Sequence, residues 1–235
     1  MIERNLLITK TLKLEPKSLS VFSTVTRTNL NEARRLMVES QIRSRGINNE
    51  HVLKAMESVP RHQFVAKNQS HLAYADCPLP IDHRQTISQP YIVAYMTEQL
   101  QVKPNHRVLE IGTGCGYQTA ILAELAWEVY SLEVIPELAE AATARLNKMN
   151  YRNITISSGN GRDGWPENAP FDRIIVTAAP NAIPPALISQ LAAPGKMIIP
   201  VGHTHFNQNL ELVTKNAVGT VEYFTRVGVR FVPLV

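Results

Sequence analysis

The chain has 235 residues, of which 44% are hydrophobic, so it can bury the core of one large domain. No stretch approaches the roughly eighteen consecutive apolar residues of a membrane-spanning helix, and we expect no membrane contact. The formal charge of +4 lies within residues 1–36, and residues 37–235 carry equal numbers of acidic and basic groups. A nucleic-acid partner is not expected, because such proteins concentrate basic groups on the working domain. The two cysteines form no disulfide framework, which fits a reducing compartment such as the cytoplasm.

Residues 1–28 show no sustained hydrophobic period and are rich in serine and threonine, so we predict a poorly ordered extension. Its apolar runs are too short for the core of a cleaved secretory signal. Two explanations stay open. One is an organelle presequence, against which Glu3 and Glu15 count, and the other is an early start codon, with Met37 as the internal start.

Residues 29–90 are predicted to hold helices followed by a long loop. Asn29 and Glu32 match the capping box that begins a helix, and Gly46 suits its C-terminal end. A second helix is expected over about residues 49–58, before Pro60. Four prolines then punctuate residues 60–90. A loop of this length inside a compact domain is usually functional.

From residue 91 onward, strand-like and helix-like segments alternate. This alternation predicts the α/β class, with right-handed βαβ units and a mostly parallel, doubly wound sheet. The last two strands have no helix between them, so we expect an antiparallel hairpin at the C-terminal edge of the sheet. The predicted helices are residues 90–100, 117–126, 138–149 and 184–191, and the predicted strands are residues 107–111, 129–132, 154–157, 172–177, 196–201, 210–214 and 221–229.

A glycine-rich loop follows the first strand of this core, at the usual ligand-binding position of an open α/β sheet. Gly112, Gly114 and Gly116 occupy every second position. A dinucleotide site has the pattern G-x-G-x-x-G and would place a glycine where this chain has Tyr117. The spacing therefore disfavours a nicotinamide or flavin oxidoreductase.

Two carboxylates flank the loop and indicate its ligand. Glu110 ends the strand before the first glycine, where it can meet the cationic amino group of a methionine moiety and would repel a pyrophosphate. Glu133 ends the next strand, about 20 residues on, where an acid can bind a ribose diol. The loop and the two acids together predict an S-adenosylmethionine-dependent methyltransferase. We also expect Thr113, Gly161 and Thr177 in the cofactor site.

Five segments of the chain form a recognisable set: PRHQFV (60–65), TISQP (86–90, the most diagnostic), VLEIGTGCGYQTA (108–120), IIVTAAP (174–180) and RFVPL (230–234). Together they resemble the protein-L-isoaspartate (D-aspartate) O-methyltransferases, and the resemblance covers about residues 33–234. It implies a Rossmann-like methyltransferase fold over residues 29–235, with its core in residues 91–235. It also implies methyl transfer from S-adenosylmethionine to the free α-carboxylate of L-isoaspartyl and D-aspartyl residues in damaged proteins and peptides, giving an ester that collapses to a succinimide.

The resemblance further implies Ser88 as the active-site residue. A carboxylate acceptor is already ionised at neutral pH and needs orientation rather than a general base, so hydroxyl groups suffice. A competing role for the serine is to cap the helix that begins at Pro90. The RFVPL segment resembles the part of the family that lies alongside the substrate backbone, and it is a candidate edge for strand-like pairing. The residues expected at the substrate are Thr86, Ser88, Gln89, His83, Arg84 and Val232.

The chain departs from the family pattern at two places. Asn160 replaces an aspartate that contacts the adenine amino group, and its amide oxygen can still accept that hydrogen bond, so we expect weaker cofactor binding. Asp82 and Arg84 stand where the family commonly has glycines. Arg84 would be strained at positive φ, so a different loop shape is expected beside Ser88. Arg84 could also contribute charge to a peptide carboxylate.

Other functions remain as alternatives or are disfavoured. A methyltransferase for another acceptor and a cofactor-binding module without turnover both stay open. A hydrolase would need a G-x-S-x-G elbow around its serine, which Ser88 lacks. His203 and His205 lack a third ligand, so no metal site is expected. A reactive role is not expected for Cys115 in the glycine loop, and we expect a monomer.

Overall fold

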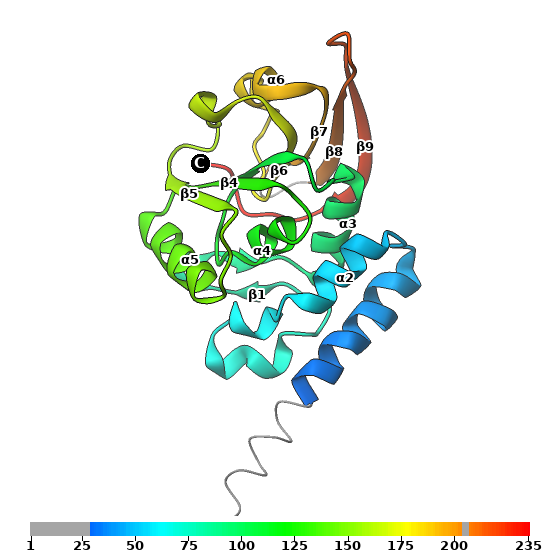
Figure 1. Ribbon diagram of the computed structural model, residues 1–235, viewed down its shortest axis with the longest axis vertical. Coiled ribbons are helices and arrows are strands. Elements are labelled where there is room, and N and C mark those ends of the chain that lie inside the picture. Colours follow the sequence, from blue (N-terminus) through cyan, green and yellow to red (C-terminus); the bar gives the residue numbers. More distant parts are fainter. Residues whose placement is uncertain (1–28, 204–206) are drawn as a thin grey trace, which may run out of the picture.

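The computed structural model describes residues 29–203 and 207–235. The expectations for residues 1–28 and for His205 therefore lie outside the described residues. A central sheet carries helices on both of its faces (Figure 1), which confirms the predicted α/β class. Among the described residues, none of the helices has the length and apolar character needed to cross a membrane.

A long helical segment leads into the domain. Residues 29–37 are helical and continue through a π-helical turn, Val38–Ile42, and a 3-10 turn, Arg43–Arg45. The segment ends at Gly46, whose φ of 94° is left-handed, as predicted for the C-terminal end. The residues before Asn29 lie outside the described part of the chain, so the capping box at Asn29 stays a prediction.

The second helix, α2 (Glu50–Ser58), begins where the sequence predicts. The Asn49 side chain caps it by accepting hydrogen bonds from two backbone N–H groups of the first turn. The segment that follows is the expected long connection, and it also holds a small antiparallel sheet. The strands of that sheet are β1 (Leu79–Pro80) and β2 (Thr86–Ile87).

A buried arginine fixes this connection to the core. Arg61 is fully buried, and its Nε donates a hydrogen bond to the Ala73 carbonyl oxygen at 2.9 Å. Its guanidinium group lies 4.9 Å from the centre of the Tyr117 ring, in a cation–π contact. Tyr117 is the first residue of the helix after the glycine loop, so the connection and the loop are joined through this contact.

The main sheet has seven strands in the order β5-β4-β3-β6-β7-β8-β9. Neighbours from β5 to β7 pair in parallel, and β8 and β9 pair antiparallel, which confirms the predicted hairpin edge. The strands are β3 (Arg107–Ile111), β4 (Glu128–Glu133), β5 (Ile154–Ser158), β6 (Phe171–Val176), β7 (Leu191–Val201), β8 (Gln208–Lys215) and β9 (Val221–Val229).

The helices cover the two faces of the sheet unequally. Helices α3, α4 and α5 lie on the face that also holds α2, and α6 lies on the other (Figure 1). The bounds of these helices are α3 (Pro90–Leu100), α4 (Tyr117–Ala123), α5 (Pro136–Lys148) and α6 (Pro185–Gln190). Since the connections on the two sides of β3 run to opposite faces, the loops after β3 and β6 flank a topological switch point, where open α/β sheets bind ligands.

Two elements differ from their predicted bounds by three or more residues at one end. β7 begins at Leu191, five residues before the predicted start, because Leu191 pairs with Phe171 across a register shift. The sequence Ala-Ala-Pro-Gly after Leu191 is typical of a turn, so this part of the strand is not predicted from the residue types. α4 ends at Ala123, three residues before its predicted end.

Candidate active site

The glycine loop connects β3 to α4 at the switch point. Gly112, Gly114 and Gly116 have φ values of 96°, 54° and 86°, so all three lie in the left-handed region that favours glycine. A Cβ atom on Gly112 would lie 2.4 Å from Thr177 Oγ1. The Thr177 hydroxyl in turn lies 2.7 Å from the Gly112 carbonyl oxygen. The ends of β3 and β6 therefore approach so closely that position 112 admits only glycine.

Three cavities that share lining residues lie near the loop, and two of them are lined by its glycines. The loop cavity has a volume of about 160 Å³ and lies between the glycine loop and the C-terminal tail. The inner cavity, of about 40 Å³, lies between the glycine loop and the 86–88 segment. The groove, of about 620 Å³, runs from the 86–89 segment to the C-terminal end of β9. Of the described residues, only Thr86 lines all three cavities, and Ser88 lines the inner cavity and the groove.

Glu133 lies in the wall of the loop cavity and holds the loop in place. Its Oε2 accepts a hydrogen bond from the Gly114 N–H at 2.8 Å, and its Oε1 accepts one from the Ile135 N–H at 3.1 Å. A carboxylate oxygen has a second lone pair, so both oxygens can accept a further hydrogen bond. The structure thus places Glu133 where the sequence predicts a diol-binding acid.

Glu110 lies beneath the loop and lines none of the three cavities. It is fully buried, and its Oε2 accepts hydrogen bonds from Thr119 Oγ1 at 2.5 Å and from Ser131 Oγ at 2.6 Å. Among the described residues, no group donates a hydrogen bond to its Oε1. Burial raises the pKa of the Glu110 carboxyl to about 8, against the two hydroxyl donors that lower it. Ser131 also contacts the Thr113 hydroxyl, at 2.6 Å.

Ser88 does not cap the helix that follows it. The N-cap residue of α3 is Gln89, which makes no side-chain capping hydrogen bond. Asp76 supplies the cap instead, because its Oδ1 accepts from the Tyr91 N–H at 3.3 Å. The Ser88 hydroxyl has no hydrogen-bond partner among the described residues. The competing role considered for this serine is therefore not observed.

Asp76 anchors the segment that carries Ser88. Its Oδ2 accepts a hydrogen bond from Gln89 Nε2 at 2.6 Å and forms an ion pair with Arg45 Nη1 at 2.6 Å. The Arg45 guanidinium also lies 3.5 Å from the centre of the Tyr91 ring. Gln89 lines the groove, but its amide nitrogen is directed at Asp76. Asp76 was not among the predicted site residues. Its only distinguishing feature in the sequence is that it is an acidic residue inside the proline-punctuated loop.

The C-terminal tail forms walls of both larger cavities. Ala179 donates to the Val232 carbonyl oxygen at 2.8 Å and accepts from the Leu234 N–H at 2.9 Å. Arg162 Nη2 donates to the Leu234 carbonyl oxygen at 2.6 Å. One edge of the tail is therefore already paired within the chain. Val232 lines the loop cavity rather than the groove.

A buried glutamine fixes the base of this tail. Gln208, 1% exposed, accepts from the Phe231 N–H at 2.6 Å and donates to the Phe231 carbonyl oxygen at 3.2 Å. Its amide thus pairs with the tail as a neighbouring strand would. Gln208 also lines the groove, and nothing in its sequence position at the start of a strand pointed to this role.

Asn160 and Arg84, which depart from the family pattern, lie at the margins of the site, as does His83, which was expected at the substrate. Asn160 is exposed, and its Oδ1 accepts from the Arg162 N–H at 2.9 Å, while Gly161 lines the loop cavity. His83 and Arg84 are exposed, line none of the three cavities, and have φ values of 55° and 58°. Both residues thus adopt the left-handed conformation that glycine would take without steric cost.

A search of the described residues for clusters of three or more His, Cys, Asp or Glu side chains that could hold a metal ion finds none. The expectation that His203 and His205 form no metal site stays a prediction, since His205 lies outside the described residues. Cys77 and Cys115 are both free thiols, and burial raises the pKa of the Cys115 thiol.

Comparison with solved structures supports the assignment of the fold. A structure described as a protein-L-isoaspartate O-methyltransferase superposes with a TM-score of 0.77 at 26% identity, covering 86% of this chain and 65% of that longer chain. This chain thus spans a little under two thirds of that protein. A Plasmodium falciparum protein described as a protein-L-isoaspartate O-methyltransferase, solved in complex with S-adenosyl-L-homocysteine, gives a TM-score of 0.72 at 26% identity, covering 86% of this chain and 98% of that one.

Sequence comparisons agree with these structures. The protein-L-isoaspartate O-methyltransferase of Gloeobacter violaceus is 52% identical over 198 residues, which cover 84% of this chain and 96% of the relative. The sequence model of the family described as protein-L-isoaspartate(D-aspartate) O-methyltransferase matches residues 31–235. Glu133, the glycine loop and the 86–90 segment surround adjoining cavities, and Glu110 is buried beneath the loop. Together with these sequence matches, the arrangement shows that this chain belongs to the protein-L-isoaspartate(D-aspartate) O-methyltransferase family.

Proposed function

We propose that the enzyme transfers the methyl group of S-adenosylmethionine to the free α-carboxylate of L-isoaspartyl and D-aspartyl residues in damaged proteins and peptides. The resulting methyl ester collapses to a succinimide. The observation that carries this proposal is the position of Thr86, which lines the loop cavity, the inner cavity and the groove together. A cofactor in the loop cavity and a peptide in the groove would meet at Thr86.

The chain's own residues fit the cofactor. When bound, S-adenosylmethionine supplies an electrophilic methyl group on a positively charged sulfur. Glu133 has acceptor capacity directed at the loop cavity, which suits the hydroxyls of a ribose. Glu110 lines none of the three cavities, but its Oε1 is a buried acceptor without a donor among the described residues. We therefore assign it to the cofactor's ammonium group, on which it would act from beneath the glycine loop. We further assign Thr113, Gly161 and Thr177 to the walls around the cofactor and Asn160 to the adenine end.

The acceptor requires orientation rather than activation. A carboxylate is ionised at neutral pH, so no base has to remove a proton from it. The Ser88 and Thr86 hydroxyls can each donate one hydrogen bond to an acceptor oxygen and hold it in line with the methyl group. The Ser88 hydroxyl suits this role because no described residue uses it.

The groove suits an extended peptide. Its wall combines Ser88, Gln89 and Ile92 with the start of β8 and the end of β9. Among the described residues that line it, Arg230 is the one charged side chain. We place the substrate backbone along this wall and the isoaspartyl side at Thr86. We also propose a cytoplasmic location, where the two free thiols stay reduced.

Radiolabelled methyl transfer tests the function. Transfer from S-adenosylmethionine to an isoaspartyl peptide should exceed transfer to the same peptide with a normal aspartyl residue. Calorimetry should show cofactor binding in the same preparation. Cofactor binding without isoaspartyl-dependent transfer would refute the proposal and favour either a different acceptor or a binding module without turnover.

Replacing Ser88 tests the site. In Ser88→Ala, kcat for the isoaspartyl peptide should fall about tenfold or more, because one orienting hydroxyl is lost. The dissociation constant of S-adenosyl-L-homocysteine should stay within about twofold, since the loop cavity does not include Ser88. Ser189→Ala, at an exposed serine of α6, is the matched control and should leave kcat unchanged. Loss of cofactor affinity with unchanged kcat would contradict the assigned position.

A further inference from the structure

The wall of the groove is positive at one point, where the Arg230 side chain lines it. Among the described residues that line the groove, no acidic side chain offsets this guanidinium group. The polar residues of the wall have uncharged hydroxyl or amide groups: Thr86, Ser88, Gln89, Asn207, Gln208 and Asn209. Since arginine stays protonated at physiological pH, the positive charge of the wall is permanent.

The Arg230 side chain has its hydrogen-bond donors available. It is exposed, and it makes no hydrogen bond, ion pair or aromatic contact with the other described residues. Nothing in that part of the chain therefore competes for its five N–H groups, which form a planar fork. This fork matches the two oxygens of a carboxylate and can bind both of them at once.

The backbone on either side of Arg230 is held in place. Before it, Val229 pairs with Gln208 as the last residue of β9. After it, the Phe231 N–H donates to Gln208 Oε1 at 2.6 Å, and the Phe231 carbonyl oxygen accepts from Gln208 Nε2 at 3.2 Å. Arg230 therefore projects from a fixed point of the wall, and only its side chain would lose conformational freedom when a ligand binds.

Arg230 lines the groove and neither of the other two cavities, whereas Thr86 lines all three. In the proposed function the acceptor carboxylate lies at Thr86, next to the cofactor cavity that Arg230 does not reach. A guanidinium group on the acceptor would also oppose the reaction, because it would stabilise the negative charge that the acceptor loses on methylation. The ligand of Arg230 is therefore a second carboxylate of the substrate.

From these features we propose that Arg230 determines substrate preference, by pairing with an acidic side chain of the substrate that lies close to the isoaspartyl residue. This inference rests on the proposed function, since it takes the groove as the peptide site. Successive side chains of an extended peptide point to opposite sides, at intervals of about 3.3 Å. The preference should therefore be confined to one position of the peptide and be absent at the positions next to it.

Peptide kinetics at low ionic strength test the preference. A host isoaspartyl peptide carries Glu, Gln or Lys at one of the two positions before or the two positions after the isoaspartyl residue. At the responsive position, the wild-type KM for the Glu peptide should be about three to ten times lower than that for the Gln peptide, with a similar kcat. The Lys peptide should have the highest KM. The difference should shrink in about 1 M salt, where the Debye length is about 3 Å.

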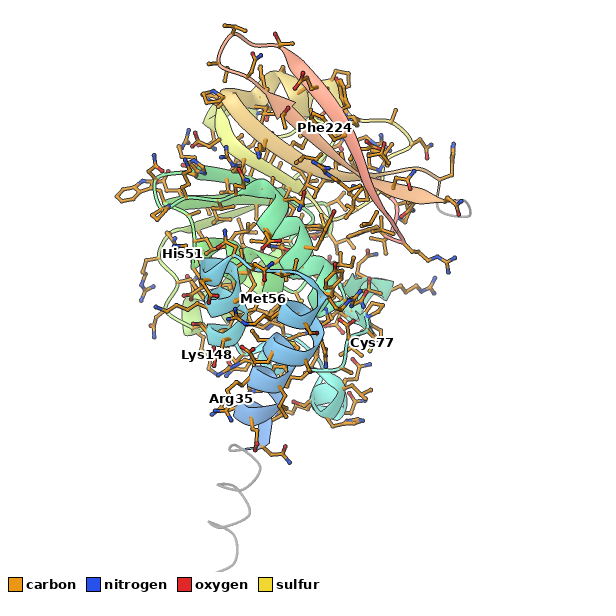
Figure 2. The ribbon with its side chains drawn as sticks, turned by 90° about the vertical axis from the view of Figure 1, so that its right-hand side faces the viewer. Arg35, His51, Met56, Cys77, Lys148 and Phe224 are labelled. Atoms are coloured by element: carbon orange, nitrogen blue, oxygen red, sulfur yellow. The ribbon has the colours of Figure 1, made fainter. Side chains whose placement is uncertain are left out.

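Variants of Arg230 assign the preference to this residue. Arg230→Gln should make the KM values of the Glu and Gln peptides equal within about twofold, and Arg230→Glu should reverse the order, so that the Lys peptide has the lowest KM. The matched control is Arg35→Glu, at an exposed arginine that lines none of the three cavities, and it should keep the wild-type order. Figure 2 shows Arg35 at the opposite end of the molecule from Phe224 of β9.

The possible results separate this inference from the proposed function. Transfer to isoaspartyl peptides without a charge preference, or with a preference that Arg230→Gln retains, would overturn this inference alone. An equal loss of kcat/KM for all peptides in Arg230→Gln would also overturn it, because Arg230 would then act on a group that all these substrates share. No transfer to any isoaspartyl peptide would overturn the proposed function and this inference together.

Cofactor binding provides the control for folding. Arg230 does not line the loop cavity, so the dissociation constant of S-adenosyl-L-homocysteine should match wild type in every variant. A variant that keeps this constant is folded, and its order of KM values then reports substrate preference alone.

Discussion

Arg84 has a φ of 58°, and its neighbour His83 has a φ of 55°. A side chain at left-handed φ costs about 1–2 kcal/mol because its Cβ crowds the backbone. Arg84→Gly should therefore raise the free energy of unfolding by about 0.5–1 kcal/mol, after allowing for the greater freedom of glycine in the unfolded chain. Urea denaturation measures this change.

Arg84→Ala provides the matched control. It removes the same charge but keeps a Cβ atom, so it should not stabilise the protein. Both variants also test the hypothesis that Arg84 contacts the peptide. An increase in KM for an isoaspartyl peptide in both variants would support that contact, and an unchanged KM in both would remove Arg84 from the substrate site. Stabilisation in both would contradict the strain argument.

Glu110 makes the stability of the free enzyme depend on pH. Its pKa is about 8 in the folded protein and 4.5 as the reference value for the unfolded chain, so between these values only the folded state binds the proton. The contribution to stability is complete below about pH 4.5 and is lost as the pH rises through about 8, at up to about 1.4 kcal/mol per pH unit.

Glu110→Gln keeps an acceptor for Thr119 and Ser131 but cannot ionise. The free energy of unfolding of wild type, relative to this variant, should therefore fall as the pH rises from 5 to about 8. Taking the difference between the two proteins cancels the contributions of His62 and His106, whose pKa values burial lowers. Urea denaturation at several pH values measures it, and parallel curves would contradict the assigned pKa.

At the scale of elements, the 86–90 segment depends on Asp76 for its position. Asp76→Asn puts an amide among donors from Arg45, Gln89 and the Tyr91 N–H, so at least one contact is lost. We expect kcat to fall about tenfold because Ser88 shifts relative to the acceptor. The dissociation constant of the cofactor should be unchanged. Steady-state kinetics and calorimetry separate the two effects.

Arg45→Met is the control for Asp76. It removes the half-exposed ion pair but keeps the contacts of Asp76 with Gln89 and Tyr91, so kcat should change by less than about twofold. The contrary result would be that Asp76→Asn lowers only the melting temperature and leaves kcat unchanged at assay temperatures well below it. In that case Asp76 is a structural residue and not a positioning residue.

Strongly periodic elements could be predicted from the sequence, and long-range contacts could not. α3, β3 and β9 have the predicted bounds, because prolines, glycines and β-branched residues mark their ends. The glycine loop and Glu133 also follow from local spacing. Asp76 and Gln208 could not be found in this way. Their partners lie 13 and 23 residues away along the chain, and no period or motif records such pairs.

At the scale of the whole molecule, the tail couples the loop cavity to the groove. Phe231 lines the groove, Val232 and Leu234 line the loop cavity, and Gln208 holds the segment at its base. Gln208→Leu leaves the Phe231 N–H and C=O groups without partners, at about 1–3 kcal/mol for each buried group. We expect both the cofactor dissociation constant and the peptide KM to rise several-fold.

Arg162→Met is the control at the other end of the tail. It releases only the Leu234 carbonyl oxygen, next to the loop cavity, so cofactor affinity should fall while the peptide KM stays close to wild type. Lower stability of Gln208→Leu with both constants unchanged would show that the tail is not part of the functional surface.

The pairing of the tail with Ala179 also separates the formation of the fold from the onset of activity. Residues 230–235 add no strand to the seven-stranded sheet, yet they form walls of the loop cavity and of the groove. A folding intermediate could thus form every strand, and show the circular dichroism signal of the native secondary structure, before it becomes active as a methyltransferase. Recovery of catalysis after dilution from denaturant would then lag behind recovery of secondary structure, by the time that a few residues need to dock against the end of β6.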